Sequence, residues 1–132
     1  MEVFGSRWKN HWQRIAADWK SRVSDDDVVL IAGDTSWAMH LKDAQEDLDQ
    51  IRALPGRKIM IRGNHDYWWE SAGKLNRMDA ENKIQYLYGS TAVLGDKEIA
   101  ICGTHGWVCP GDIHYQEDRD AKPYRRELLR VE

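Results

Sequence analysis

Two short apolar runs separated by one amphipathic stretch constrain the fold of this chain more than any other feature. The runs at 28–31 and 58–61 have the length and the β-branched content of buried strands. Between them, apolar side chains recur at steps of three and four and predict a helix over residues 41–53. They are Leu41, Ala44, Leu48 and Ile51, and Pro55-Gly56 ends the helix. Strand, helix and strand in this order indicate a parallel βαβ unit, so we expect an α/β fold.

The rest of the sequence continues this pattern, and we expect one domain over residues 1–132. An early helix is expected to place five apolar side chains in the core; they are Trp8, Trp12, Ile15, Trp19 and Val23. Residues 67–75 are expected to be helical with a break at Gly73, and residues 117–131 are expected to form the last helix. Three short strands are expected at 84–88, 91–94 and 98–102.

Composition excludes several classes of protein. The chain has 132 residues, and 19 lysines and arginines against 22 aspartates and glutamates give a formal net charge of −3. This balance offers no electrostatic basis for bulk nucleic-acid binding, and 42% hydrophobic residues argue against a disordered chain. The longest apolar run, 28–32, falls far short of a membrane span, which needs about 20 residues. No secretion signal opens the chain, so we expect a cytoplasmic protein.

Polar residues follow both strands of the βαβ unit at the point where each strand ends. Gly33-Asp34 follows the first run and Gly63-Asn64-His65-Asp66 follows the second, at the edge where open α/β sheets bind ligands. Asp34 and Asn64 offer hard oxygen ligands for a divalent cation, and His65 can bind metal or act as a general acid. Each cluster alone is more often a helix N-cap or an Asx turn. Their recurrence at two consecutive strand ends favours a functional site.

Together, these two clusters resemble the second and third signature motifs of the calcineurin-like metallophosphoesterases. The similarity covers nearly the whole chain and includes residues 3–5, 8–12, 33–39, 54–56, 63–69, 74–76, 103–107 and 124–129. The wider context is similar to a bacterial branch of predicted phosphohydrolases. The resemblance implies that the βαβ core belongs to a layered α/β/β/α sandwich.

The resemblance also implies a metal-dependent hydrolysis of a phosphate ester. In this family the aspartate matching Asp34 bridges two metal ions, and the asparagine matching Asn64 binds the second ion. The histidine matching His65 approaches the substrate phosphate and stabilises or protonates the leaving oxygen. Asp66 is expected to fix the tautomer and orientation of that histidine ring. The implied cofactors are two divalent ions (Mn, Fe, Zn or Mg), which clamp an in-line displacement by a bridging hydroxide.

Other signatures of the family do not occur in this sequence. It has neither the Asp-x-His that ends the family's first strand nor the later Gly-His-x-His, and His11, His40 and His114 match neither motif. We expect truncation at both ends, with exposed strand edges where the remaining parts would pack. By itself the chain is then expected to have little or no catalytic activity unless a partner chain supplies further ligands.

Four tryptophans lie next to these motifs, namely Trp37, Trp68, Trp69 and Trp107. They either shape a pocket, with an indole stacking on a nucleobase, or pack in the core beneath it, and burial statistics favour the core. His105 stands where members of this branch carry an arginine that can pair with phosphate. His105 lines the pocket or packs against the strand end, and its role stays open.

Two functions from different classes follow. The first is a metal-dependent phosphoesterase acting on a phosphomonoester or phosphodiester, with no membrane partner. The second is a non-catalytic remnant or binding module of the same fold that cannot assemble both metals. A Rossmann-type nucleotide binder is less favoured, because no Gly-x-Gly-x-x-Gly follows either strand. The sequence leaves the substrate, the metal and the oligomeric state open.

Overall fold

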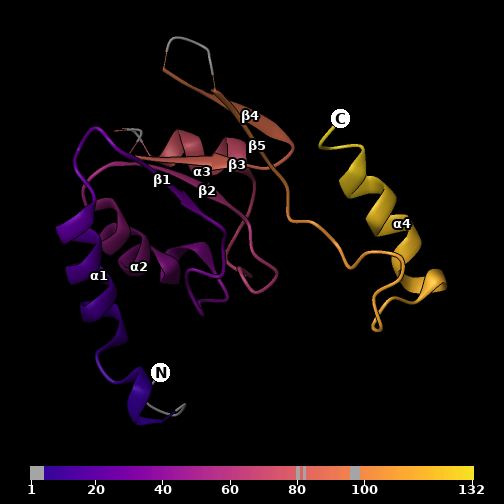
Figure 1. Ribbon diagram of the computed structural model, residues 1–132, viewed down its shortest axis with the longest axis horizontal. Helices are drawn as coiled ribbons and strands as arrows, with labels where there is room; N and C mark the ends of the chain where they lie inside the picture. The colour runs from indigo at the N-terminus through magenta and orange to yellow at the C-terminus, as the bar shows by residue number, and fades with distance from the viewer. Residues whose placement is uncertain (1–4, 80, 82, 96–98) are drawn as a thin grey trace.

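The computed structural model of the chain describes residues 5–79, 81, 83–95 and 99–132 (Figure 1). In chain order, its elements are η2 Ser6–Trp8 (a 3-10 helix), α1 His11–Arg22, β1 Val28–Ile31, α2 Leu41–Arg52, β2 Arg57–Ile61, α3 Ala72–Met78, β3 Ile84–Leu87, β4 Ser90–Leu94, β5 Ile99–Gly103 and α4 Glu117–Leu128. Val3, Phe4 and Glu98, which belong to predicted segments, lie outside the described residues.

A parallel sheet with strand order β1-β2-β3 forms the centre of the fold. Leu30 pairs with Ile59 in register, and Ile59 pairs in turn with Gln85. Parallel neighbours need a crossover connection, and α2 supplies it between β1 and β2 while α3 supplies it between β2 and β3. The predicted α/β class with a βαβ core is therefore confirmed.

α2 forms where its apolar periodicity places it and buries one stripe of side chains. The buried residues are Leu41, Ala44, Leu48 and Ile51, as predicted. The helix ends just before Pro55-Gly56, and Gly56 adopts a φ of 83°, which glycine tolerates because it has no Cβ. This stripe packs against Met60 in β2 and Tyr86 in β3, so it covers one face of the sheet.

The other face of the sheet is covered by the antiparallel hairpin of β4 and β5. Side chains alternate between faces along a strand, so Ile59 and Ile61 of β2 point away from α2 and pack in a second cluster with Ala92 of β4. The approach is close at Gly103, where an added Cβ would lie 2.2 Å from Ile61 Cγ2. The structure thus stacks helices, a parallel sheet and a hairpin.

α1 is less buried than its pattern predicts. None of its residues is buried, and Ile15 is 49% exposed. Trp12 packs at the edge of the core, and Trp19 donates its indole N–H to the carbonyl of Pro55 at 3.0 Å. Trp8, in η2, is also exposed. The prediction of three core tryptophans on this helix is therefore wrong, and its apolar face forms a half-buried flank.

β1 is an edge strand rather than a buried one. Within the described residues it pairs with β2 on one side only. Leu30 is 61% exposed because the apolar cluster on its face of the sheet, centred on Ile59 and Leu87, does not extend over it. The predicted burial of this strand is wrong, whereas the predicted exposed strand edge is present in the described part of the chain.

The C-terminal half follows the prediction with one exception. α3 contains Gly73, and residues 67–71 are not helical, so the predicted helix with a break at Gly73 is wrong. The helix begins after Ser71, whose Oγ accepts the N–H of Lys74 at 3.2 Å as an N-cap. α4 stands to the right of the sheet in Figure 1, and its Glu127 accepts a hydrogen bond from the Oη of Tyr88, the residue that follows β3, at 3.4 Å. Across the described ranges, no helix has the length and apolar character that crossing a membrane requires.

Candidate functional site

The loops that leave β1 and β2 touch each other at two glycines. A Cβ added to Gly33 would lie 2.1 Å from the amide nitrogen of Gly63, and one added to Gly63 would lie 2.1 Å from Asp34 Oδ1. Gly33 also has a φ of 95°, a region that L side chains rarely adopt. Glycine is therefore required at both positions, and it lets the Asp34 carboxylate occupy the space beside Gly63.

Asp34 is held against the backbone of the second loop. Its Oδ1 accepts the backbone N–H of His65 at 2.9 Å, and its Oδ2 lies 3.4 Å from His65 Nδ1. Asp34 has a φ of 55°, a left-handed conformation that aspartate adopts more readily than most residues. Its side chain is nonetheless 48% exposed, so the carboxylate is accessible from the surface.

Asn64 and His65 complete the group of predicted residues at this junction. The Asn64 amide nitrogen lies 3.4 Å from His65 Nε2, and both residues are exposed. If the amide donates to Nε2, that nitrogen is an acceptor and the ring proton sits on Nδ1, where it faces Asp34. The structure therefore brings together Asp34, Asn64 and His65, three of the four predicted site residues.

Asp66, the fourth, has a different role from the one expected. Its side chain is fully buried, and its two oxygens accept the N–H groups of Asp34 at 2.8 Å, Thr35 at 2.9 Å and Gly63 at 2.8 Å, together with the indole N–H of Trp68 at 2.9 Å. The carboxylate beside the His65 ring is that of Asp34. The expectation that Asp66 orients the ring is wrong, because Asp66 instead clamps the two loops together.

The donors at this junction fit a divalent metal ion in type but not in number. The carboxylate oxygens of Asp34 and the amide oxygen of Asn64 are hard ligands, and both residues are exposed. Such ions take about four to six ligands or more. Within the described ranges, no group of three or more histidine, cysteine, aspartate or glutamate side chains is arranged to hold a metal.

A sequence model of the calcineurin-like phosphoesterase family matches residues 6–131 of this chain. The chain belongs to the calcineurin-like phosphoesterases. No curated protein and no solved structure matches it at a significant level. Membership of this family supports a phosphoesterase-type activity.

The tryptophans near the candidate site fall into two groups. Trp68 and Trp69 are buried at 1% and 7% exposure, as the core interpretation predicts. Trp37 and Trp107 are exposed, at 70% and 38%. Trp107 lines a cavity of about 570 Å³ together with Asn64 and His105. His105 was expected either to line the pocket or to pack against the strand end, and it lines the pocket. The fold brings His105 and Trp107, which follow β5, close to Asn64, which follows β2.

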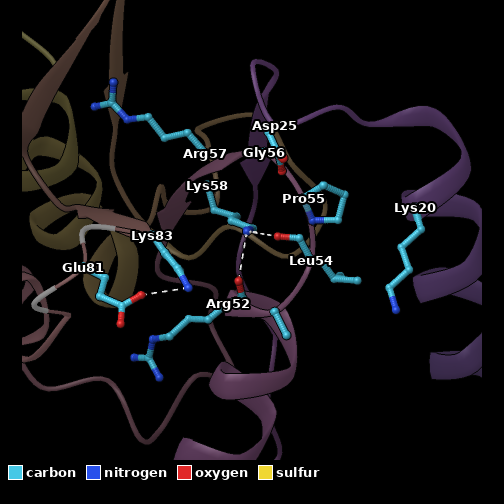
Figure 2. A pocket seen from close by; sticks show the side chains of 11 residues that line it. Lys20, Asp25, Arg52, Leu54, Pro55, Gly56, Arg57, Lys58, Glu81 and Lys83 are labelled. Carbon is cyan, nitrogen blue, oxygen red and sulfur yellow. Dashed lines mark hydrogen bonds and ion pairs between the residues drawn. The ribbon is translucent and has the colours of Figure 1, made fainter.

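A larger cavity, of about 670 Å³, lies at the opposite, amino end of the parallel strands (Figure 2). Two of its cationic side chains, Lys58 and Lys83, already have partners. Lys58 is 1% exposed and its ammonium group donates to the carbonyls of Leu54 and Arg52 at the end of α2. Lys83 pairs with Glu81 at 2.8 Å. Since the Lys58 contacts close the end of α2, this cavity is a structural junction.

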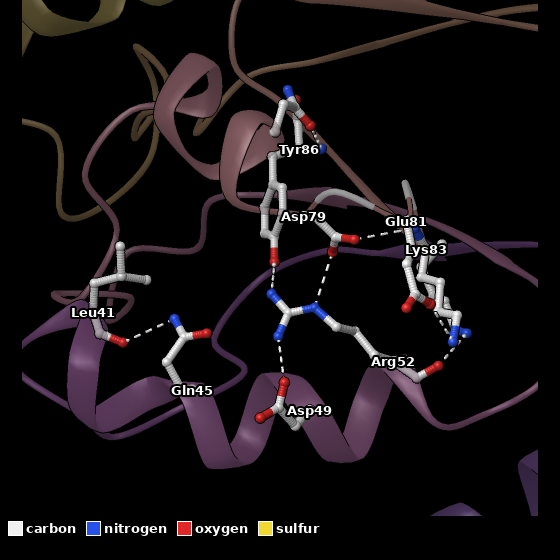
Figure 3. A network of polar contacts seen from close by, with 10 residues as sticks. Leu41, Gln45, Asp49, Arg52, Asp79, Glu81, Lys83 and Tyr86 are labelled. Atoms are coloured by element: carbon white, nitrogen blue, oxygen red, sulfur yellow. Dashed lines mark hydrogen bonds and ion pairs between the residues drawn. The ribbon is translucent and has the colours of Figure 1, made fainter.

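A network of charged side chains links this junction to Tyr86 in β3 (Figure 3). The guanidinium group of Arg52 donates to Asp79 at 3.0 Å and to Asp49 at 2.6 Å, and it approaches the hydroxyl of Tyr86 at 3.4 Å. Asp79 is 4% exposed, so its charge is neutralised by Arg52 where water has little access. The network anchors α2 to α3 and β3.

The buried ammonium group of Lys58 predicts a pH dependence of stability. Burial, reinforced by the nearby charge of Lys83, lowers the pKa of Lys58 below its ordinary 10.5. Between the two values the unfolded chain binds more protons than the folded one, so stability increases as the pH rises toward 10.5. We expect the free energy of unfolding of the wild type, relative to Lys58→Met, to increase from pH 7 to pH 10 in urea titrations.

The comparison of the wild type with Lys58→Met separates the effect of Lys58 from that of other groups that titrate at alkaline pH. Burial raises the pKa of Tyr86 to about 12, and this residue is present in both proteins, so its effect cancels in the difference. A difference between wild type and Lys58→Met that stays constant from pH 7 to pH 10 would show that the folded chain holds Lys58 with an ordinary pKa.

Proposed function

We propose that this chain is a metal-dependent phosphoesterase. In this proposal Asp34 and Asn64 supply ligands to a divalent metal centre, and His65 stabilises or protonates the leaving oxygen. The observation that carries the proposal is the convergence of these three residues at the carboxyl ends of β1 and β2, where open α/β sheets bind ligands. As part of the same proposal, the substrate is a phosphomonoester or phosphodiester, the centre holds two ions, and the compartment is the cytoplasm.

The residues of the junction divide the chemistry between them. Asp34 and Asn64 would hold the ions through carboxylate and amide oxygens, and ions of this kind, when bound, lower the pKa of water and polarise phosphoryl oxygens. His65 stands between these two side chains, so its ring lies where it can deliver a proton to a leaving oxygen at the same site. Asp66 acts on the geometry alone by clamping the loops.

A second function is favoured by one specific observation. No group of three histidine, cysteine or acidic side chains able to hold a metal occurs in the part of the chain that the structure describes. A non-catalytic binding module of the same fold would have this property, because two ligands hold a metal weakly. The retention of metal by the chain therefore discriminates between the two functions.

The first test is metal binding. After loading with Mn²⁺ and desalting, elemental analysis is expected to find metal in the wild type, and Asp34→Ala and Asn64→Ala are each expected to reduce it at least about ten-fold because each removes one oxygen ligand. Asp26→Ala is the control, since Asp26 is an exposed carboxylate in the loop before β1. The loaded protein should then hydrolyse 4-nitrophenyl phosphate or bis(4-nitrophenyl) phosphate and lose this activity on chelation.

Two outcomes would count against the enzyme. If the wild type retains no Mn²⁺, the binding-module function replaces it. If Asp34→Ala and Asn64→Ala bind as much Mn²⁺ as Asp26→Ala, the metal lies elsewhere and the proposed centre is wrong.

A further inference from the structure

A cavity of about 570 Å³ adjoins the proposed metal centre, and its walls come from three segments of the chain. Asn64 contributes from the loop after β2, whereas His105, Trp107 and Val108 follow β5, and Arg119 belongs to α4. This volume lies within the range of small-molecule sites, about 300–1,000 Å³. A ligand that reaches Asn64 therefore has room to extend onto the surface around Trp107.

Trp107 is held in one orientation by a buried carboxylate. Its indole N–H donates to Asp120 Oδ1 at 3.1 Å, and Asp120 is only 1% exposed. Asp120 also receives two hydrogen bonds from the guanidinium group of Arg119, at 2.8 and 2.7 Å, and the backbone N–H of Gln116 at 2.8 Å. The Arg119 bonds, with smaller help from Gln116 and Trp107, keep the pKa of Asp120 far below its usual range. The carboxylate is thus a permanent acceptor for the indole.

The comparison with Trp68 shows what is unusual about Trp107. Both indoles donate to a buried carboxylate, Trp68 to Asp66 and Trp107 to Asp120. Trp68 is 1% exposed, whereas Trp107 is 38% exposed and lines the cavity. A tryptophan that only filled the core would be buried like Trp68. Trp107 is instead an aromatic surface fixed in place beside open space.

A second ring stands next to this surface. The His105 ring lies 5.9 Å from that of Trp107 with the planes at 39°. Its Nδ1 lies 2.8 Å from the carbonyl oxygen of Gly106, so Nδ1 carries a proton and donates. Since Arg119 and Asp120 neutralise each other, the cavity beside Asn64 presents aromatic faces rather than a net charge. Such a surface suits a flat, uncharged ring.

We propose that Trp107 is a stacking platform for a planar aromatic ring carried by the substrate, so that the site selects phosphate esters bearing such a ring, as nucleotides do. The proposal rests on the proposed function only in taking the phosphate to lie at the Asp34–Asn64 junction. Stacking of a nucleobase on an aromatic side chain strengthens binding by roughly five-fold to a hundred-fold.

The test compares two sugar phosphates, of which only one carries an aromatic base. In calorimetric titrations of the metal-free chain, adenosine 5′-monophosphate is expected to bind about ten-fold more tightly than ribose 5-phosphate. Trp107→Leu is expected to remove this difference, and Trp107→Phe to keep most of it. Trp8→Leu, which removes another exposed tryptophan that does not line the cavity, is expected to leave the difference intact. In NMR spectra, the indole N–H signal that disappears in Trp107→Phe should shift with adenosine 5′-monophosphate only.

Each outcome bears directly on the platform. Equal affinity of the wild type for the two ligands, or an indole signal of Trp107 that shifts with neither, would overturn it, and both measurements hold even if Trp107→Leu fails to fold. A loss of the difference in Trp8→Leu as well would overturn the assignment to Trp107. Ring-dependent binding through Trp107 in a chain that retains no Mn²⁺ would support the platform while contradicting the proposed phosphoesterase activity.

Discussion

Asp66→Ala is expected to lower the free energy of unfolding by about 4 kcal/mol, a large share of the stability of a domain of this size. The substitution leaves the backbone N–H groups of Asp34, Thr35 and Gly63 and the indole N–H of Trp68 without their acceptor. Each unsatisfied buried donor costs about 1–3 kcal/mol, and water entering the space recovers part of this. Urea unfolding followed by circular dichroism measures the loss.

A conservative variant separates the charge from the shape of this side chain. Asp66→Asn keeps the volume but turns one acceptor oxygen into an N–H₂ group that faces two donors, so we expect about half the loss of Asp66→Ala. Asp26→Ala changes an exposed carboxylate and should stay within about 0.5 kcal/mol of the wild type. An Asp66→Asn protein as stable as the wild type would show that the clamp does not depend on the carboxylate.

The function of Asp66 could not be predicted from its neighbours in the sequence. Asp66 follows His65 directly, and this adjacency suggested that it orients the histidine ring. The chain turns at residues 64–65, so the two side chains diverge, one to the surface and one into the core. The true partners, Asp34 and Thr35, lie about thirty residues earlier, and only the packing of β1 against β2 brings them into reach.

The features predicted correctly from the sequence are those set by interactions between residues close together in the chain. The apolar spacing of α2 and the Pro55-Gly56 stop are local signals, and both its bounds and its buried stripe were predicted closely. Residues 28–31 were predicted to form a buried strand, yet Leu30 is exposed, because the position of a strand within a sheet depends on chain segments far away. Local periodicity reports which face is apolar and not what covers it.

The same limit explains why Asp34, Asn64 and His65 were found, while the choice for Trp107 between a pocket wall and core packing stayed open. The three site residues follow predicted strands directly, and a general rule places the ends of parallel strands at one edge. The indole of Trp107 depends on Asp120 in a different element, with an irregular segment between them. Nothing in the residue types at these two positions indicates the pairing, so only the fold reveals it.

Gly33→Ala is expected to be about as damaging as the loss of Asp66, at about 4 kcal/mol or more of unfolding free energy. Two costs add at this position. The φ of 95° disfavours any L side chain, and the new Cβ would lie 2.1 Å from Gly63 N, 2.5 Å from Gly63 Cα and 2.8 Å from the carbonyl carbon of Arg62. Since all three are backbone atoms, no rotamer change relieves the clash. Urea unfolding again provides the measurement.

Gly111→Ala provides a matched control for the backbone cost, because Gly111 has the same φ of 95° with nothing within 4 Å of an added Cβ. This variant is expected to lose only the conformational part, about 1–2 kcal/mol. The excess of Gly33→Ala over Gly111→Ala then measures the contact between the two loops. If the two variants lose equal stability, the loops are free to separate. A large excess, accompanied by loss of Mn²⁺ binding, would mean that the close approach that stabilises the fold also sets the distance between Asp34 and Asn64.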